Sequence, residues 1–162
     1  MTKRLTRELT PIEQQVIAEI RAMRASQDKH LSSGLLDDPP RMVHHFIQTF
    51  HGHVQLHVRP IARELCIEMR TLHRNFVARY GKTLLQYQVE VRLGFCRWLL
   101  SVFPQAKISV IATMLGYRQV RDFNRFFQDH MHQTPTEWSR KERDRIERKV
   151  SHMSRNRNSS DS

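Results

Sequence analysis

The stretch ATMLGYRQVRDFNRFFQ, at residues 112–128, predicts a helix-turn-helix. Its first residues continue an apolar stripe with the three- and four-residue spacing of a short helix, formed by Ile108, Ile111, Ala112 and Leu115. Gly116 then offers the backbone freedom with which helices commonly end. The aromatic and charged residues that follow have the periodicity of a second helix.

This second helix has two chemically different faces. Phe123 and Phe127 form an apolar stripe together with Val120 and Met131. The opposite side, beside Asn124, carries Arg118, Arg121, Arg125 and Gln128. Arg matches guanine and Asn matches adenine in the major groove of DNA, so the polar side could read base edges. An isolated cationic face is more often only solvated, and repetition of the pattern decides between the two interpretations.

A second copy of the motif lies about fifty residues upstream, at residues 62–77. The two copies match in their core residues, in the turn and in their polar residues. The aligned pairs are Ile61 and Ile111, Ala62 and Ala112, Cys66 and Gly116, Arg70 and Arg121, Leu72 and Phe123, His73 and Asn124, Arg74 and Arg125, and Phe76 and Phe127. A chance repeat with matched core and matched arginines is improbable, so the motif is interpreted as one device used twice.

The chain is strongly basic, with a net charge of +11 and a pI near 10.6 over 162 residues. The excess lies mainly in residues 41–140, where fourteen Lys and Arg face six Asp and Glu. Such a charge indicates a polyanionic partner, either nucleic acid or an anionic membrane surface. The length suits one domain, or two small ones, and is too short for a ligand-sensing domain of usual size beside a DNA-binding one.

Residues 1–40 are expected to form an N-terminal helical extension and a linker. Thr10 is placed as an N-cap, with Pro11 at the first helical position and Glu13 closing a capping box. The helix should end by Ser26 or Asp28. Its apolar stripe, within residues 10–27, is expected to dock on the domain as core, and the alternatives are a dimer seam or contact with another protein. Pro39 and Pro40 end the linker, so the next helix is expected from Arg41.

The predicted fold class is all-α: two helix-turn-helix units joined by a long central helix, plus the N-terminal extension. We expect the first unit at 41–81, the central linker helix at 82–104, the second unit at 105–140, and a basic, partly disordered tail at 141–162. The segment from Thr83 to about Val102 is apolar around much of its circumference, which predicts packing against both units over about 30 Å. Thr134, Pro135 and Glu137 predict the start of a closing helix.

Other kinds of site have little support in the sequence. Five histidines between His44 and His57 lack the Cys or carboxylate cluster that would complete a metal shell, so no metal and no cofactor is expected, and a metal-responsive switch is the alternative. Cys66 and Cys96 lie thirty residues apart, which suits a reducing cytoplasm. The sequence contains no apolar run of membrane-spanning length and no motif of the common enzyme classes. We therefore expect a cytoplasmic protein without enzymatic activity.

In combination, residues from about 41 to 140 resemble the DNA-binding domain of AraC/XylS-type bacterial transcription regulators. The matching pieces are Ile61-Ala62, Leu72-x-Arg74-x-Phe76, Tyr80-Gly81, Tyr87, Arg92-Leu93, Leu99-Leu100, Ile111-Ala112, Gly116-Tyr117, Phe123-x-Arg125-x-Phe127, Thr134-Pro135 and Trp138. The resemblance implies a seven-helix fold that binds double-stranded DNA in adjacent major grooves and regulates transcription, usually as an activator in contact with RNA polymerase. Carried over by position, the groove-facing residues are Arg70, His73, Arg74, Arg121, Asn124 and Arg125.

The chain departs from the family pattern at several local positions. Cys66 stands in the first turn, Glu68 and Gln119 replace the usual Ser N-caps, and His132 replaces a helix-ending Gly. Capping should be weaker by about 1 kcal/mol at each changed N-cap. The short N-terminus resembles stand-alone members of the family, which bind asymmetric sites as monomers. A non-specific nucleic-acid-binding or architectural protein is the alternative function.

Overall fold

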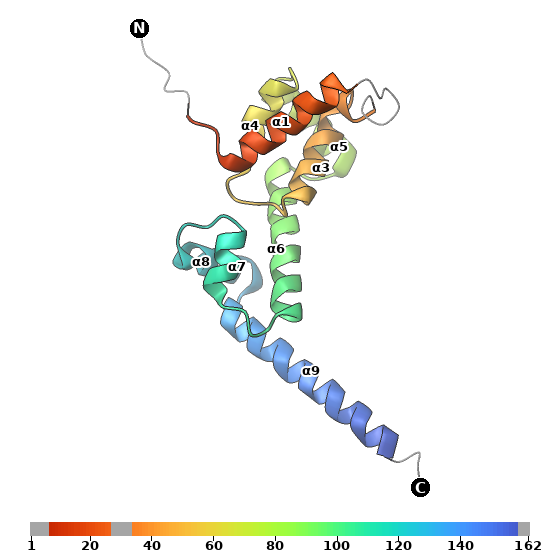
Figure 1. Cartoon of the computed structure of the whole chain (residues 1–162), viewed down its shortest axis with the longest axis vertical. Helices are drawn as coiled ribbons and strands as arrows, with labels where there is room; N and C mark the ends of the chain where they lie inside the picture. The colour runs from red at the N-terminus through yellow and green to blue at the C-terminus, as the bar shows by residue number, and fades with distance from the viewer. Residues whose placement is uncertain (1–6, 27–33, 159–162) are drawn as a thin grey trace. The chain divides into compact units, whose positions relative to one another are not determined.

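The computed structural model describes residues 7–26 and 34–158, with the side chains described as far as Met153 (Figure 1). Its described residues form helices and turns without any strand, so the predicted all-α class is confirmed. The helices are α1 (Pro11–Ala25), α3 (Pro39–Thr49), α4 (Val58–Glu64), α5 (Met69–Tyr80), α6 (Leu84–Val102), α7 (Ile108–Met114), α8 (Val120–Met131) and α9 (Pro135–Asn158). The chain forms two compact units, residues 1–92 and residues 93–162.

The core of unit 1 joins the N-terminal helix to the first helix-turn-helix. Val16 and Ile20 of α1 are fully buried in the same cluster as Phe46 of α3, Ile61 of α4 and Phe76 of α5. The apolar stripe of α1 is thus part of the domain core, as expected. At roughly 25 cal/mol per Å² of buried apolar surface, two such aliphatic side chains contribute several kcal/mol to folding, so α1 is an integral part of this unit.

The ends of α1 and α3 follow from their capping residues. Thr10 caps α1 and forms the predicted capping box with Glu13. The helix ends at Ala25 with Ser26 as its C-cap, and the following residues 27–33 lie outside the described part of the chain. The expectation that α3 begins at Arg41 was wrong, because α3 begins at Pro39 with Asp38 as its N-cap. Both prolines fit the first turn, where the missing N–H would have no partner within the helix.

The core of unit 2 is built on the second half of α6. Cys96, Leu99 and Leu100 are buried with residues of α7 and α8, including Ile111 and Phe127. The long helix predicted between Thr83 and Val102 is confirmed. It is less covered than its apolar composition predicted, since Leu85 is 67% exposed and Trp98 is 53% exposed. Each half of α6 therefore presents one face to a core and leaves another face open.

The last helix is longer than the sequence indicated. Thr134 caps α9, its hydroxyl accepting a hydrogen bond from the Glu137 N–H at 3.2 Å. The helix continues through Lys149 to Asn158, so the tail at 141–162 that was expected to be partly disordered is helical as far as residue 158. Residues 159–162 lie outside the described part of the chain. The Arg, Lys and Glu residues at 140–149 are good helix formers, and a helix once formed extends more easily than it starts, which carries it into the Ser-, Asn- and Arg-rich residues on which the prediction of disorder rested.

The internal repeat extends beyond the helix-turn-helix units into the helices that follow them. At the start of α6 the Thr83 hydroxyl accepts from the Gln86 N–H at 3.1 Å, just as Thr134 accepts from Glu137 at the start of α9. Four residues after each of these threonines comes an aromatic residue that packs on the preceding helix. Tyr87 lies 5.7 Å from Phe76 between ring centroids, and Trp138 lies 6.2 Å from Phe127. The repeated block is thus α4–α5–α6 and α7–α8–α9.

Candidate nucleic-acid interface

The first helix-turn-helix consists of α4 and α5, joined by a four-residue turn. Its backbone reverses at Cys66, which has the left-handed φ of 55°. The turn is closed by the Ile67 N–H, which donates to the Ala62 carbonyl at 3.0 Å. Left-handed backbone is costly for a residue with a side chain, at about 1–2 kcal/mol, and this turn therefore stores strain where glycine would not.

The second helix-turn-helix, α7 and α8, has the same turn geometry. Gly116 takes the left-handed position with φ 84°, and the Tyr117 N–H donates to the Ala112 carbonyl at 2.9 Å. The alignment of Cys66 with Gly116 is therefore confirmed. The turn between α7 and α8 is one residue longer than the turn between α4 and α5. When Glu68 is aligned with Gln119, the extra residue is the exposed Arg118.

The ends of α5 and α8 agree with the departures seen in the sequence. Glu68 and Gln119 occupy the N-cap positions, and neither makes a side-chain capping hydrogen bond. At the other end, Gly81 and His132 take the left-handed C-cap position with φ 67° and 54°. Both C-cap N–H groups donate to the carbonyl four residues earlier at 2.8 Å. The histidine thus performs the capping role of a glycine, at the cost of backbone strain.

The predicted polar faces of α5 and α8 are open to solvent. Leu72 and Phe76 bury one side of α5, and Phe123 and Phe127 bury one side of α8. The predicted site residues that are exposed are Arg70, His73 and Arg74 on α5, Arg121, Arg125 and Gln128 on α8, and Arg118 in the preceding turn. On each of the two helices the structure brings the predicted residues together opposite the core.

Asn124 differs from the other predicted residues. It is half-buried, and its side-chain Oδ1 is enclosed without a hydrogen-bond partner among the described groups. It directly follows Phe123, so it lies at the edge of the apolar stripe, and reading adenine would require its amide to turn outward. Asp122, which no sequence pattern singled out, places its carboxylate 3.7 Å from the Arg121 guanidinium and partly neutralises that cation.

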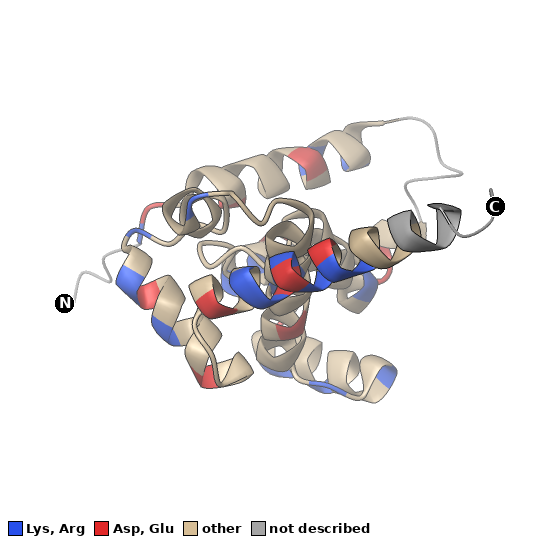
Figure 2. Ribbon diagram, turned by 90° about the horizontal axis from the view of Figure 1, so that it is seen from below, with Lys and Arg blue, Asp and Glu red and all other residues tan. Residues whose placement is uncertain are grey.

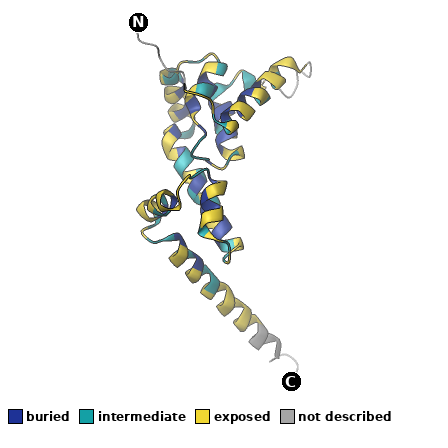
Figure 3. Cartoon of the chain, turned by 60° about the vertical axis from the view of Figure 1, so that its left-hand side comes forward, coloured by how far each residue is buried: buried dark blue, intermediate teal, exposed yellow. Residues whose placement is uncertain are grey.

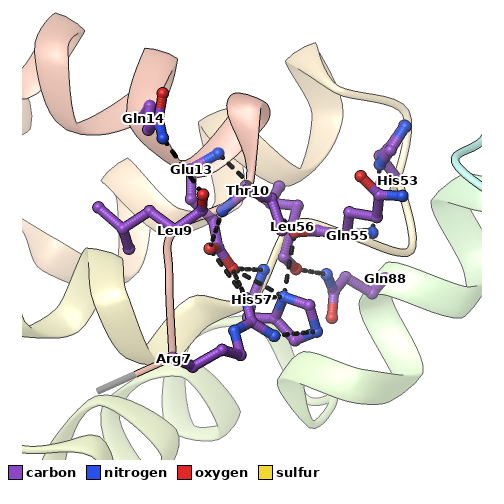
Figure 4. Close-up of polar contacts among 10 residues, drawn as sticks. All are labelled: Arg7, Leu9, Thr10, Glu13, Gln14, His53, Gln55, Leu56, His57 and Gln88. Atoms are coloured by element: carbon purple, nitrogen blue, oxygen red, sulfur yellow. Dashed lines mark hydrogen bonds and ion pairs between the residues drawn. The ribbon is translucent and has the colours of Figure 1, made fainter. Parts of the chain in front are cut away.

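A polar network holds residues 7–13, at and just before the start of α1, beside the start of α4 (Figure 4). Glu13 has no solvent exposure and pairs with Arg7 at 2.6 Å and with the His57 Nδ1 at 2.7 Å. It also accepts from the Thr10 N–H at 2.8 Å. Burial alone would raise the pKa of Glu13, but these hydrogen bonds outweigh it and lower the pKa. Since His57 is the N-cap residue of α4, the network positions the first helix-turn-helix.

Two further contacts hold the same unit together from either side. In the loop between α3 and α4, the Gly52 carbonyl accepts a hydrogen bond from Arg92 Nε of α6 at 2.6 Å. At the far end of α4, Glu64 accepts hydrogen bonds from Arg21 and Arg24 of α1, both at 3.1 Å. The guanidinium of Arg21 lowers the pKa of Glu64 despite a small opposing effect of burial. Thus α1 and α6 both support the scaffold that carries α5.

Two of the histidines between His44 and His57 make specific contacts within unit 1. His44 stacks against the rings of both Tyr80 and Tyr87, with centroid distances of 4.4 and 4.6 Å, and burial lowers its pKa. His57 belongs to the Glu13 network. In the described part of the chain, no three His, Cys, Asp or Glu side chains gather as a metal site would require. No helix in that part is both long enough and apolar enough to cross a membrane.

Comparison with known proteins agrees with this geometry. A family model described as "Helix-turn-helix domain" matches residues 61–141, half of the chain. Among solved structures, the chain is similar to the C-terminal domain of AraT, a response regulator from Geobacillus stearothermophilus, with 21% identity and a TM-score of 0.59. That match covers 64% of this chain and 85% of the other, and it supports the shared fold. No curated protein matches the chain significantly.

The matched residues contain both turns, both exposed polar helices and the start of α9. The chain therefore belongs to the helix-turn-helix domain family and carries an AraC-type DNA-binding domain of a transcription regulator.

Proposed function

We propose that this protein is a sequence-specific DNA-binding regulator that inserts α5 and α8 into two adjacent major grooves. The observation that carries the proposal is the duplicated turn, in which the left-handed Cys66 and Gly116 each precede a helix with one buried apolar face and one exposed cationic face. A helix of this kind, held by a turn and a supporting helix, is the element that reads the major groove.

The residues that we assign to base and phosphate contacts lie on the polar sides of α5 and α8 and in the turn before α8, and all of them except the half-buried Asn124 are exposed. In α5 they are Arg70, His73 and Arg74, and in the second unit they are Arg118, Arg121, Asn124, Arg125 and Gln128. The arginines suit guanine O6 and N7, and Asn124 suits adenine once its amide turns outward. The 19 residues of α6 measure about 28 Å, which is close to the roughly 34 Å between successive major grooves on one side of a duplex.

We further propose that the protein activates transcription from its site, through contact with RNA polymerase, in the bacterial cytoplasm. It binds DNA as a monomer, in the manner of the stand-alone members of the family. Burial of Val16, Ile17 and Ile20 within unit 1 supports the monomer, because these side chains are then not available as a dimer seam.

Selection of bound duplexes from a random DNA pool, followed by footprinting, tests the proposal. One asymmetric site of about 20 base pairs that survives excess competitor DNA is the expected result. Failure to enrich any sequence would contradict it and would indicate a non-specific architectural protein. An inverted repeat of full sites would contradict the monomer. Salt dependence alone does not separate the two functions, since both release counterions.

A further inference from the structure

The second half of α9 lies beyond the core of unit 2. At its start, Trp138 packs on Phe127 and under the guanidinium of Arg97, and Ser139 is buried. Further along, exposure rises from 40% at Ile146 to 57% at Val150 and 66% at Met153. Figure 3 shows the same change, from dark blue segments near the start of α9 to yellow ones further on. The later turns of α9 thus contribute little to folding and are free to serve another purpose.

These turns carry a cationic stripe on one side of the helix. Its members follow the spacing i, i+4, i+7, i+8 and i+11, which places them within about 100° of one another around the helix axis. They are Lys141, Arg145, Arg148, Lys149 and His152, and all five are exposed. By the same geometry Asp144 and Glu147 lie outside this stripe and Glu142 lies at its edge, while basic and acidic residues alternate along the helix in sequence (Figure 2).

Most of the stripe is available to bind an anion. Glu142 pairs with Arg145 at 2.6 Å, and Lys141 Nζ donates to Gln133 Oε1 at 2.8 Å. Arg148 Nε donates only to the Asp144 carbonyl, at 3.2 Å. Among the side chains that the structure describes, no carboxylate forms an ion pair with Arg148 or Lys149. Lys141, Arg145, Arg148 and Lys149 place four cations along about 12 Å of helix, over which duplex DNA presents roughly seven phosphate charges.

We propose that this stripe contacts the phosphate backbone of the DNA beside the bases read by the helix-turn-helix units. The inference rests on the proposed DNA-binding function. Charge complementarity favours a polyanion, and α9 begins only four residues after the end of α8, within the same compact unit. Phosphate contacts fix position and add affinity but read no sequence. The stripe therefore strengthens binding to any duplex without changing the preferred site.

The test compares two variants with the same loss of charge. Arg148→Gln/Lys149→Gln removes the two stripe cations that have no carboxylate partner, whereas Arg41→Gln/Arg140→Gln removes two exposed cations outside the stripe. Affinity for a random-sequence duplex of about 40 base pairs is measured over a range of salt concentrations. The stripe variant should reduce the log–log salt slope by about 0.9 for each lost contact, or about 1.8 in all, and the control should leave it unchanged. Circular dichroism checks that both variants keep their helix content.

Equal slopes for the stripe variant and the wild-type protein would overturn the inference, even if the wild type still selects a DNA site. If the stripe variant has a smaller slope than the wild type but the wild type selects no DNA site, the result would support the phosphate contact and contradict the proposed function. Loss of binding to vesicles of anionic phospholipid, with unchanged DNA affinity, would assign the stripe to a membrane surface and would also overturn the inference. A changed preferred sequence would show that the stripe reads bases, contrary to the proposal.

Discussion

Cys66 and Gly116 occupy the same left-handed backbone position in the two turns, with φ 55° and 84°. Only the second turn has the residue that adopts this conformation without steric cost. The two helix-turn-helix units thus share their geometry but differ in the strain that their turns store.

Replacing Cys66 with glycine should stabilise unit 1. The substitution relieves about 1–2 kcal/mol of left-handed strain and loses part of that gain to the greater freedom of glycine in the unfolded chain, for a net gain of about 1 kcal/mol. Urea unfolding followed by circular dichroism measures the change. Cys66→Ala is the matched control, because it removes the thiol and keeps the strain. An equal gain in both variants would show that the thiol, and not the backbone, is the source.

Gly52→Ala should strongly destabilise unit 1. An added Cβ would lie 2.4 Å from the Gln88 carbonyl oxygen and 2.9 Å from the Arg92 nitrogen, at a residue whose φ is already 65°. Backbone atoms cannot easily move aside, so we expect a loss of about 3 kcal/mol or more in the free energy of unfolding. Gly94→Ala is the control, since nothing lies within 4 Å of its Cβ position and alanine favours the helix by about 1 kcal/mol. Similar stability of Gly52→Ala and the wild type would contradict the close approach.

The Glu13 carboxylate should make stability depend on pH in the acid range. Its pKa is lowered from 4.5 in the folded chain, so its contribution is complete above about 4.5 and is lost as the pH falls through the lower folded pKa. Glu13→Gln should cost about 1–3 kcal/mol at pH 7, because the buried network loses its negative charge and one of its two acceptor oxygens. Urea midpoints at pH 7 and pH 3.5 measure both effects. Glu8→Gln, at an exposed position, should change neither, and an equal loss in the two variants would refute a specific role for the network.

Arg125→Ala should weaken DNA binding by about 1–3 kcal/mol and relax the preference at one position of the selected site. Arg74→Ala, the equivalent change in α5, should relax a different position. Competition binding against single-base variants of the selected duplex measures the effect. A uniform loss across all sequences would identify the residue as a phosphate contact and would contradict its assignment to a base.

Much of this architecture follows from local sequence signals. The three- and four-residue spacing of Leu72 and Phe76, and of Phe123 and Phe127, gives both the helices and their buried sides. The exposure of Arg74 and Arg125 then follows from helical geometry alone. Capping by Thr10 and Thr134 is equally local, because each cap bonds within its own first turn.

The features that the sequence did not indicate depend on contacts between distant residues. The approach of Gly52 to Arg92 spans forty residues, and the burial of Glu13 depends on His57, forty-four residues away. Neither leaves a periodic pattern. The Thr83 cap, by contrast, had a visible signal, since Thr83 and Gln86 repeat the spacing of Thr134 and Glu137. The half-burial of Asn124 depends on how closely neighbouring elements cover the edge of α8, which periodicity does not specify.

Each of the two exposed polar helices, α5 and α8, lies between one relaxed and one strained backbone position. The first unit has kept glycine at the C-cap and has cysteine in the turn, whereas the second has kept glycine in the turn and has histidine at the C-cap. A single exchange to glycine can therefore stabilise each unit by about 1 kcal/mol net. A substitution in α5 or α8 that impairs folding can therefore be compensated by a second substitution within the same unit. The two helix-turn-helix units are thus free to evolve independently.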